Sequence, residues 1–139
     1  MFVGFKKLDK NAIPFSYSRK GDACMDMYNL DDVVLTLNEP TLIRTGIAVE
    51  IPKGYEGIVR GRSGYALKKG LFVHVGTIDS AYRGDVGVVA VLLKGSHLEI
   101  PKGCRIAQFS IHPIFRIDLI ERELSETDRG DQGYGSSGF

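Results

Sequence analysis

Several features that mark particular protein classes are scarce in this sequence of 139 residues. It has no tryptophan and only two cysteines, Cys24 and Cys104. Two cysteines cannot form the disulfide framework of a small secreted domain, and their spacing does not match a zinc finger. The three histidines lie far apart, and no His-x-Glu stands with a Cys-x-x-Cys, so zinc hydrolases and zinc deaminases are disfavoured. We therefore expect a reduced, intracellular protein with two unpaired thiols.

Long hydrophobic runs and a strong net charge are also lacking. No apolar run approaches the ~18 residues of a membrane span, and Met1–Lys7 lacks the hydrophobic region of a secretory signal. The formal net charge is +1, so nucleic acid or an anionic membrane is not indicated as the main partner. The composition is that of an ordinary globular protein, with 43% hydrophobic and 25% charged residues. The length of the chain corresponds to one domain.

The dominant pattern is a series of short β-prone runs separated by Gly, Pro, Asn and Asp. The predicted strands are Val33–Leu37, Leu42–Ile51, Gly57–Arg60, Val86–Leu93, Arg105–Ile111 and Ile114–Leu119. The run Val86–Leu93 is almost wholly apolar, which predicts a place in the core or in a subunit interface. Only Ser63–Lys69 is typical of one or two helical turns. The pattern predicts an all-β domain: a sandwich, a barrel or a jelly roll.

A short internal echo supports this organisation. The segment EIPKG occurs at Glu50–Gly54 and again at Glu99–Gly103, each time with a β-prone run soon after it. Proline fixes φ and glycine supplies positive φ, so both segments are typical of chain reversals. We predict two similar strand–turn–strand corners rather than a true repeat, because the similarity does not extend further.

The strongest local group of chemically capable residues is Gly76–Asp85 (GTIDSAYRGD). An acid such as Asp79, held at the mouth of a β core, can accept a proton from water or from a sugar hydroxyl. Tyr82, three residues later, can lie flat against a sugar ring. The structural alternative is a plain turn with aspartate as a local hydrogen-bonding residue. Spacing alone favours the turn.

Three other segments carry weaker signals. Gly61-Arg62-Ser63-Gly64 joins a predicted strand to the predicted helix and offers an arginine and a hydroxyl to an anion, although it is not a Walker loop. Asp22 and Asp26 are typical of exposed turn carboxylates, and Gly103–Gln108 is typical of a strand whose Arg and Gln face water.

The chain ends in Arg129–Phe139, a glycine-rich segment that cannot hold a helix or a strand without a large entropic cost. It also carries an arginine, two serine hydroxyls and the aromatic ring of Tyr134. These groups suit an arm that wraps phosphates and stacks on a flat base. The alternative is a frayed, solvated terminus.

Taken in order, these segments resemble the five motifs of the trimeric deoxyuridine triphosphatase (dUTPase) family, over residues 20–139. The counterparts are Ala23–Met27, Arg62–Gly64, Gly76–Gly84, Gly103–Gln108 and Arg129–Gly138. Cys24 and Met27 replace the usual Gly and Leu of the first motif, and Gly61 stands where a proline is common. The segment Gly70–Gly76 is slightly shorter than in many members and lacks their Asn, whereas Tyr134 replaces a common Phe and keeps an aromatic ring.

The resemblance implies a distorted jelly roll with one short helix that hydrolyses dUTP to dUMP and pyrophosphate, limiting uracil in DNA and supplying dUMP for thymidylate synthesis. Asp79 would activate water for in-line attack on the α-phosphorus and bind the sugar 3′-hydroxyl, with Tyr82 under the deoxyribose. Backbone groups of Gly76 and Ile78 would read uracil. The resemblance places the phosphates on Arg62, Ser63, Gly64 and Gln108.

The resemblance also implies a cofactor and an assembly. Asp26 would contact Mg²⁺ through water, because this ion keeps much of its hydration. A β domain of residues 1–128 would form homotrimers with shared active sites, in the cytoplasm or inside a host cell for a viral protein. Residues 129–139 would close over a site as a flexible lid, with Arg129, Tyr134, Gly135, Ser136 and Ser137 on the nucleotide.

Two other functions use the same fold. A dCTP deaminase would need a catalytic Glu in place of the Gly76–Gly84 segment, and a pure binding or regulatory protein would not need all five motifs. A merely structural jelly roll would require neither Asp79 nor the C-terminal segment.

Overall fold

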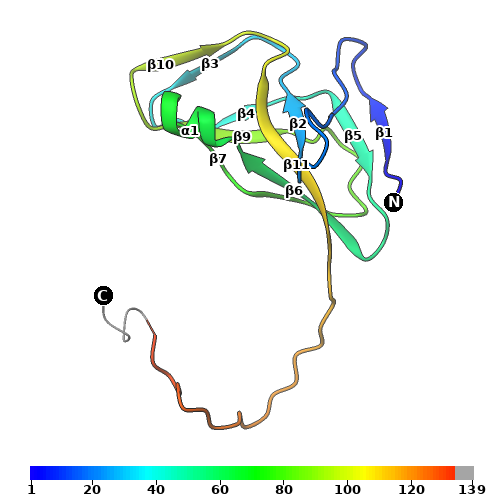
Figure 1. Ribbon diagram of the computed structural model, residues 1–139, viewed down its shortest axis with the longest axis vertical. Helices are drawn as coiled ribbons and strands as arrows, with labels where there is room; N and C mark the ends of the chain where they lie inside the picture. Colours follow the sequence, from blue (N-terminus) through cyan, green and yellow to red (C-terminus); the bar gives the residue numbers. More distant parts are fainter. Residues whose placement is uncertain (134–139) are drawn as a thin grey trace.

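The computed structural model describes residues 1–133, in which eleven strands and one helix form a β body with an extended C-terminal segment (Figure 1). The elements are β1 (Gly4–Lys7), β2 (Met25–Tyr28), β3 (Val33–Thr36), β4 (Thr41–Ile43), β5 (Ile47–Glu50), β6 (Tyr55–Gly61), α1 (Ser63–Lys69), β7 (Leu71–Val73), β8 (Gly76–Ile78), β9 (Val88–Leu92), β10 (His97–Ile100) and β11 (Arg105–Pro113). The prediction of an all-β domain with one short helix is confirmed, and no helix of the described residues is long and apolar enough to cross a membrane.

The strands pair in four small antiparallel sheets. Their orders are β1-β5, β3-β10, β2-β11-β6-β8 and β4-β9-β7. Strand β11 is nine residues long and pairs with β2 on one side and β6 on the other, so it joins segments far apart in the sequence.

The predicted corners and the predicted helix are confirmed. β5 and β10 each end within an EIPKG segment, and β6 and β11 begin soon after Gly54 and Gly103, which have φ of 85° and 76°. α1 spans the predicted residues and is followed by the capping residue Gly70, whose φ of 69° lets its N–H bond to the carbonyls of the last turn.

The prediction of one strand over 42–51 is wrong. β4 ends at Ile43 and β5 begins at Ile47, because the chain turns between them at Gly46, which has φ of 70°. The amide of Gly46 donates to the carboxylate of Asp85 (3.0 Å) instead of to a sheet partner. A distant side chain therefore sets this break, which local alternation of residues does not reveal.

The prediction of a strand over 114–119 is also wrong. β11 ends at Pro113, and residues 114–127 form no strand or helix. Figure 1 shows this segment leaving the body of the molecule. Its apolar side chains stay exposed, with Phe115 at 89% and Leu119 at 91%. β propensity alone does not make a strand when no neighbouring strand supplies hydrogen bonds.

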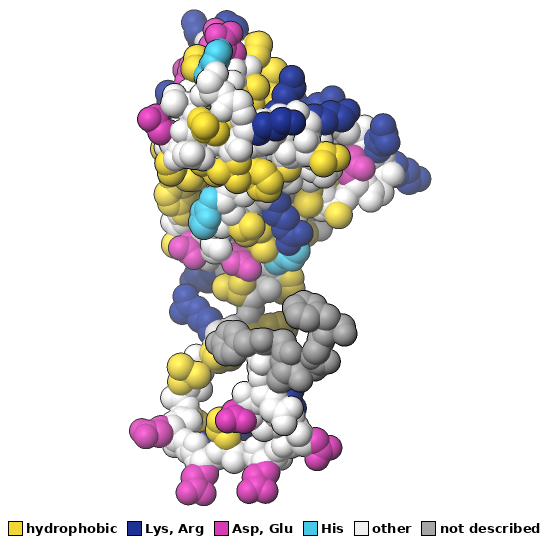
Figure 2. All heavy atoms as spheres, turned by 90° about the vertical axis from the view of Figure 1, so that its left-hand side faces the viewer, with side chains coloured by type: hydrophobic (Ala, Val, Ile, Leu, Met, Phe, Trp, Pro, Cys, Tyr) yellow, Lys and Arg dark blue, Asp and Glu magenta, His cyan; other side chains and the backbone are white. Residues whose placement is uncertain are grey.

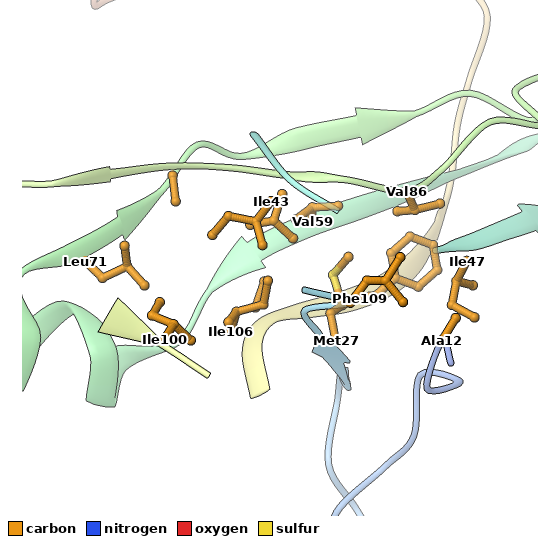
Figure 3. Packing of buried hydrophobic residues seen from close by; sticks show 14 of the residues in the cluster. Ala12, Met27, Ile43, Ile47, Val59, Leu71, Val86, Ile100, Ile106 and Phe109 are labelled. Carbon is orange, nitrogen blue, oxygen red and sulfur yellow. The ribbon is translucent and has the colours of Figure 1, made fainter. Parts of the chain in front are cut away.

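The core fills the space between the sheets (Figure 3). Phe109 of β11 is the largest fully buried side chain of the described residues, and its ring is 5.4 Å from that of Phe15, centroid to centroid. In β9, predicted to lie in the core or in an interface, Val88, Ala90 and Leu92 are buried, whereas Val89 is 41% exposed. Among the described residues, β9 therefore gives one face to the core and leaves Val89, on its other face, exposed.

Candidate functional site

The first concave region is a cationic cleft beside β2, β11 and α1. It consists of two adjoining pockets of about 390 and 370 Å³ that share Arg62 and Gln108. One is also lined by Ser18, Arg19, Asp22, Ala23, Cys24, Asp26 and Arg105, and the other by Ser63, Gly64, Tyr65, Lys68 and Lys69. Five cationic side chains thus face two carboxylates, which favours an anionic ligand.

Asp26 is the centre of this cleft. Its side chain is only 6% exposed, and it lies 3.3 Å from Nε of Arg62 and 3.4 Å from Nη1 of Arg105. The hydroxyl of Ser18 donates to the same carboxylate. A buried carboxylate requires such partners. The interpretation of Asp26 as an exposed turn carboxylate is therefore wrong, because it belongs to β2 and is enclosed by the cleft.

Strand register brings these residues together. Gln108 of β11 lies directly opposite Asp26 of β2 on one side and Arg60 of β6 on the other. The register of β11 against β2 shifts between Arg105 and Ala107. In a regular strand, residues 105 and 108 would face opposite sides. The shift lets both of them line the cleft, which is a common use of a β-bulge.

The start of α1 supplies the other wall. Arg62 precedes the helix and donates from Nη1 to the carbonyl of Arg105 (2.7 Å), which ties the helix start to β11. Nothing lies within 4 Å of the position that a Cβ on Gly64 would take, so this glycine leaves open space.

Tyr65, on the same helix, also lines the cleft. Partial burial is the main cause that raises the pKa of Tyr65, and Cys104 raises it further, whereas Arg62 lowers it. Its phenol therefore stays protonated at neutral pH.

The second concave region is the aspartate cleft, of about 460 Å³, beside β8 and β9. Its lining residues are Leu42, Arg44, Gly76, Thr77, Ile78, Asp79, Tyr82, Asp85, Gly87 and Val89. Asp79 is exposed, and Leu42 and Val89 lie opposite each other on β4 and β9. The cleft thus combines an apolar wall, the backbone of β8 and one exposed carboxylate.

A tight loop after β8 positions Tyr82 over this cleft. The amide of Tyr82 donates to the carbonyl of Asp79 (3.0 Å), and its hydroxyl donates to the carbonyl of Asp85 (3.0 Å). A Cβ on Gly84 would lie 2.3 Å from that hydroxyl oxygen, so a side chain at position 84 would push the ring of Tyr82 out of this place. Arg83 fastens the loop by donating to the carbonyls of Ser80 and Tyr82 (2.7 and 2.8 Å).

The two clefts are separate within one chain. β8 pairs with β6 so that Ile78 faces Gly57, which places Asp79 level with position 56 of β6. Arg62 follows the other end of β6, six residues on, or roughly 20 Å at the rise of a strand. The structure therefore groups the predicted residues Asp26, Arg62, Ser63, Gly64 and Gln108 in one cleft, and Gly76, Ile78, Asp79 and Tyr82 in the other.

Sequence reasoning assigned no role to several cleft residues. Arg105, Ser18 and Arg19 were not singled out, and Arg105 was expected to face water like any strand arginine. The only available signal was its place in Gly103–Gln108. The sequence gives no role to Asp85. Its carboxylate accepts hydrogen bonds from the amide and hydroxyl of Thr45 (3.2 and 3.0 Å) and organises the turn behind the aspartate cleft.

The predicted C-terminal residues are only partly within the structure. Arg129 lies in the described segment, where its Nε donates to the carbonyl of Gln132 (3.1 Å). Tyr134, Gly135, Ser136 and Ser137 lie outside the described residues. Their predicted contacts with the nucleotide stay predictions.

Comparison with known proteins identifies the family. The family model described as dUTPase matches residues 10–138. The chain belongs to the dUTPase family. A deoxyuridine 5′-triphosphate nucleotidohydrolase of Hydrogenobaculum sp. (strain Y04AAS1) is 46% identical over 96% of both chains, and one of Clostridioides difficile is 42% identical over 96% of both. The resemblance inferred from the five motifs is confirmed.

Solved structures of the family have the same fold. The dUTPase of Staphylococcus bacteriophage 80alpha with dUpNHpp superposes with a TM-score of 0.93 at 32% identity, covering 99% of each chain. A variant dUTPase from phage phi11 of S. aureus superposes with a TM-score of 0.84 at 27% identity, covering 89% of this chain and 98% of the phage chain. That phage structure is described as revealing the coordination of a structural Mg(II) ion.

Proposed function

We propose that this protein hydrolyses dUTP to dUMP and pyrophosphate by in-line attack of water on the α-phosphorus. The observation that carries the proposal is the pair of clefts: one cationic and sized for a phosphate chain, the other lined by β8 backbone, an apolar wall and an exposed aspartate. In cells this reaction would limit uracil in DNA and supply dUMP for thymidylate synthesis.

The aspartate cleft would hold the nucleoside. Asp79 is exposed, so both water and the 3′-hydroxyl can reach it. It would accept a proton from the attacking water and a hydrogen bond from the 3′-hydroxyl. Tyr82 would pack under the deoxyribose in an orientation fixed by its bond to the carbonyl of Asp85. Backbone groups of Gly76 and Ile78 would read the edge of uracil.

The cationic cleft would hold the phosphates. Phosphoryl transfer depends on positioning and on neutralising charge more than on covalent chemistry. Arg62, Ser63, Gly64 and Gln108 line this cleft together, and the open space at Gly64 leaves room for phosphate oxygens near the backbone. Alignment of the triphosphate with water could supply roughly 7–11 kcal/mol through orientation.

The residues present fit Mg²⁺ that is bound mainly by the substrate. The described residues contain no group of three or more His, Cys, Asp or Glu side chains that could cage an ion. Mg²⁺ commonly uses one or two carboxylates together with substrate phosphates and keeps several waters. Asp26, with Asp22 in the same cleft, matches that donor set. The ion would neutralise phosphate charge, and Asp26 would hold it through water.

The complete site would form between subunits of a homotrimer. Asp79 and Arg62 lie in different clefts of one chain, so a nucleotide of ordinary length would need the second cleft from a neighbour. Leu42, Phe72 and Val89 leave apolar surface on the outer face of the β4-β9-β7 sheet. Figure 2 shows hydrophobic side chains gathered across the body of the molecule. Unpartnered apolar surface of this kind suits contact with another chain.

The C-terminal residues would close the site. A lid of residues 129–139 would place Arg129, Ser136 and Ser137 on the γ-phosphate and Tyr134 on uracil, with Gly135 also in contact with the nucleotide. Stacking contributes ~1–3 kcal/mol per base, whereas ordering costs about 1–2 kcal/mol per residue. Closure should therefore depend on bound nucleotide.

Pyrophosphate release with Mg²⁺, measured side by side for dUTP, dTTP, dCTP and UTP, tests this function. The proposal predicts fast release from dUTP alone, with dUMP as product. Release from dTTP or UTP at a similar rate would contradict the assigned recognition of uracil or deoxyribose. No release from any nucleotide would leave a binding or regulatory protein on this fold.

A further inference from the structure

The ring of Tyr82 is held over the aspartate cleft mainly by hydrogen bonds. Tyr82 is 44% exposed and lies outside the hydrophobic core. Its amide donates to the carbonyl of Asp79 and its hydroxyl to the carbonyl of Asp85, both at 3.0 Å. Because core packing does not confine this ring, the bond of its hydroxyl fixes the outer end. The position of the ring therefore depends on how firmly the carbonyl of Asp85 is held.

The carboxylate of Asp85 anchors this carbonyl to a buried turn. Oδ1 accepts hydrogen bonds from the amide and the hydroxyl of Thr45 (3.2 and 3.0 Å), and both oxygens accept from the amide of Gly46 (3.0 and 3.1 Å). Thr45 and Gly46 are themselves buried. The next amide, of Val86, donates to the carbonyl of Ile47 (2.8 Å). The peptide group that bears the carbonyl of Asp85 is thus tied to residues 45–47 on both sides.

The negative charge of Asp85 strengthens this anchor. Hydrogen bonds from backbone amides to a carboxylate are roughly twice as strong as those between neutral groups. The side chain is only 21% exposed, and Nε of Arg44 lies 3.4 Å from Oδ2, which balances part of its charge. An asparagine at this position would keep one acceptor, but its NH₂ group would face the donors of Gly46 and Arg44. Only part of the anchor would remain.

We propose that Asp85 is a positioning residue that sets the discrimination between deoxyribose and ribose. It acts through the ring of Tyr82. The carboxylate ties Asp85 to the turn at residues 45–47, its carbonyl holds the hydroxyl of Tyr82, and the ring in that position leaves no room for a 2′-hydroxyl. This inference rests on the proposed function, because it places the sugar on Tyr82. It assigns no contact with the substrate to Asp85.

Steady-state kinetics with dUTP and UTP test the proposal. Asp85→Ala should lower the ratio of kcat/KM for dUTP to kcat/KM for UTP by about tenfold, the effect of one lost hydrogen bond to the ring. The change should lie mainly in KM, because Asp85 does not contact the reacting atoms. Asp85→Asn should lie between Asp85→Ala and wild type. Calorimetric binding of the α,β-imido analogues of dUTP and UTP should give the same order of ratios without turnover.

Asp32→Ala is the matched control for Asp85→Ala. The carboxylate of Asp32 also anchors a distant backbone amide, that of Lys102 (2.7 Å), but it lies outside both clefts. Loss of either anchor should lower the melting temperature. Only Asp85→Ala should change the ratio for dUTP and UTP, because only its anchor leads to the ring of Tyr82. An equal change in Asp32→Ala would reduce the effect to general destabilisation and overturn the proposal.

A double-mutant cycle tests whether Asp85 acts through Tyr82. Tyr82→Phe removes the hydroxyl and with it the bond to the carbonyl of Asp85. In that background, Asp85→Ala should lower the ratio little further. Independent losses that multiply in the double variant would show that Asp85 acts by another route, and the proposal would be overturned. Asp85→Asn replaces Asp85→Ala in the cycle if the alanine variant does not fold, which thermal denaturation would reveal.

Failure of this inference differs from failure of the proposed function. A wild type that hydrolyses dUTP, together with an Asp85→Ala variant that keeps the wild-type ratio for dUTP and UTP, would reject the role of Asp85 alone. A wild type that releases no pyrophosphate from dUTP would instead reject the proposed function.

Discussion

Gly64 contributes to the cationic cleft by lacking a side chain. A Cβ there would meet no protein atom within 4 Å and would project into the space assigned to phosphates. Because alanine is favoured over glycine within a helix by roughly 0.5–1 kcal/mol, Gly64→Ala should raise the free energy of unfolding slightly. It should also lower kcat/KM for dUTP by roughly 100-fold, through displacement of the phosphates. Urea denaturation and pyrophosphate release measure the two effects.

Gly54→Ala is the contrasting control for Gly64. Its Cβ would also meet open space, but Gly54 has φ of 85° and lies outside both clefts. This variant should therefore lose stability and keep its activity. A Gly64→Ala enzyme with full activity would show that phosphates do not approach the helix start.

Asp79 is exposed, so its role can be tested without disturbing the core. Asp79→Asn should lower kcat at least about 100-fold, because a general base contributes 10²–10⁴-fold. Binding of a non-hydrolysable dUTP analogue should persist, and the melting temperature should stay close to that of wild type. Retained hydrolysis would require another base.

At the scale of single residues, the sequence indicated which residues form the site. It did not indicate which of their side chains are buried or how they are oriented. The segments with Arg62, Asp79 and Gln108 were recognised, because they are short and contiguous. The burial of Asp26 and the orientation of Arg105 were not predictable, since both depend on register between β2 and β11 and on the shift within that register. The pairing and register of two strands far apart in the chain cannot be predicted from a single sequence by local pattern alone.

The β6–β11 pair is the element on which both clefts depend, and Gly57 is its tightest point. A Cβ on Gly57 would lie 2.6 Å from the ring of Phe109 and 2.9 Å from Ile51. Gly57→Ala should therefore lower the free energy of unfolding by about 1–3 kcal/mol through overpacking. Gly61→Ala on the same strand, where the nearest atom would lie at an ordinary 3.5 Å, should cost clearly less in the same urea titration. Equal losses would refute this view of the core.

The role of the C-terminal segment cannot be derived from contacts within one chain. Deleting residues 129–139 should greatly lower turnover, because the proposed lid is lost. The assembly should remain intact, because these residues lie beyond the β body, which ends with β11 at Pro113. Light scattering measures the assembly and pyrophosphate release measures the turnover. Full activity without these residues would remove the lid from the mechanism.

Elements whose bounds depend on neighbouring residues in the sequence were predicted correctly. Elements whose bounds depend on contacts with residues far away in the sequence were not. α1 was predicted to the residue, because a short helical run and Gly70 define it locally. The break between β4 and β5 was missed, because Asp85, some 40 positions away, sets the turn at Gly46. Residues 114–119 are apolar and β-prone, but no strand of the described residues pairs with them. They therefore form no strand in the single chain.

On the scale of the whole molecule, the described residues form two separate clefts and leave apolar side chains such as Leu42, Phe72 and Val89 exposed. The body is single and ordinary in size, so the separation of Asp79 from Arg62 does not reflect two domains. An assembly that joins the cationic cleft of one copy to the aspartate cleft of the next would complete the site and cover that surface together. Closed rotational symmetry would repeat the same junction around the assembly.

Subunit complementation tests this central claim most directly. Asp79→Asn breaks the aspartate cleft and Arg62→Gln breaks the cationic cleft, so each variant alone should be nearly inactive. Co-expressed with different affinity tags and purified through both, mixed trimers should regain up to about a third of wild-type activity, because each closed ring of three then has one junction that pairs two intact clefts. No regained activity in mixed trimers that bind dUTP would place both clefts of a site in one chain and contradict the account.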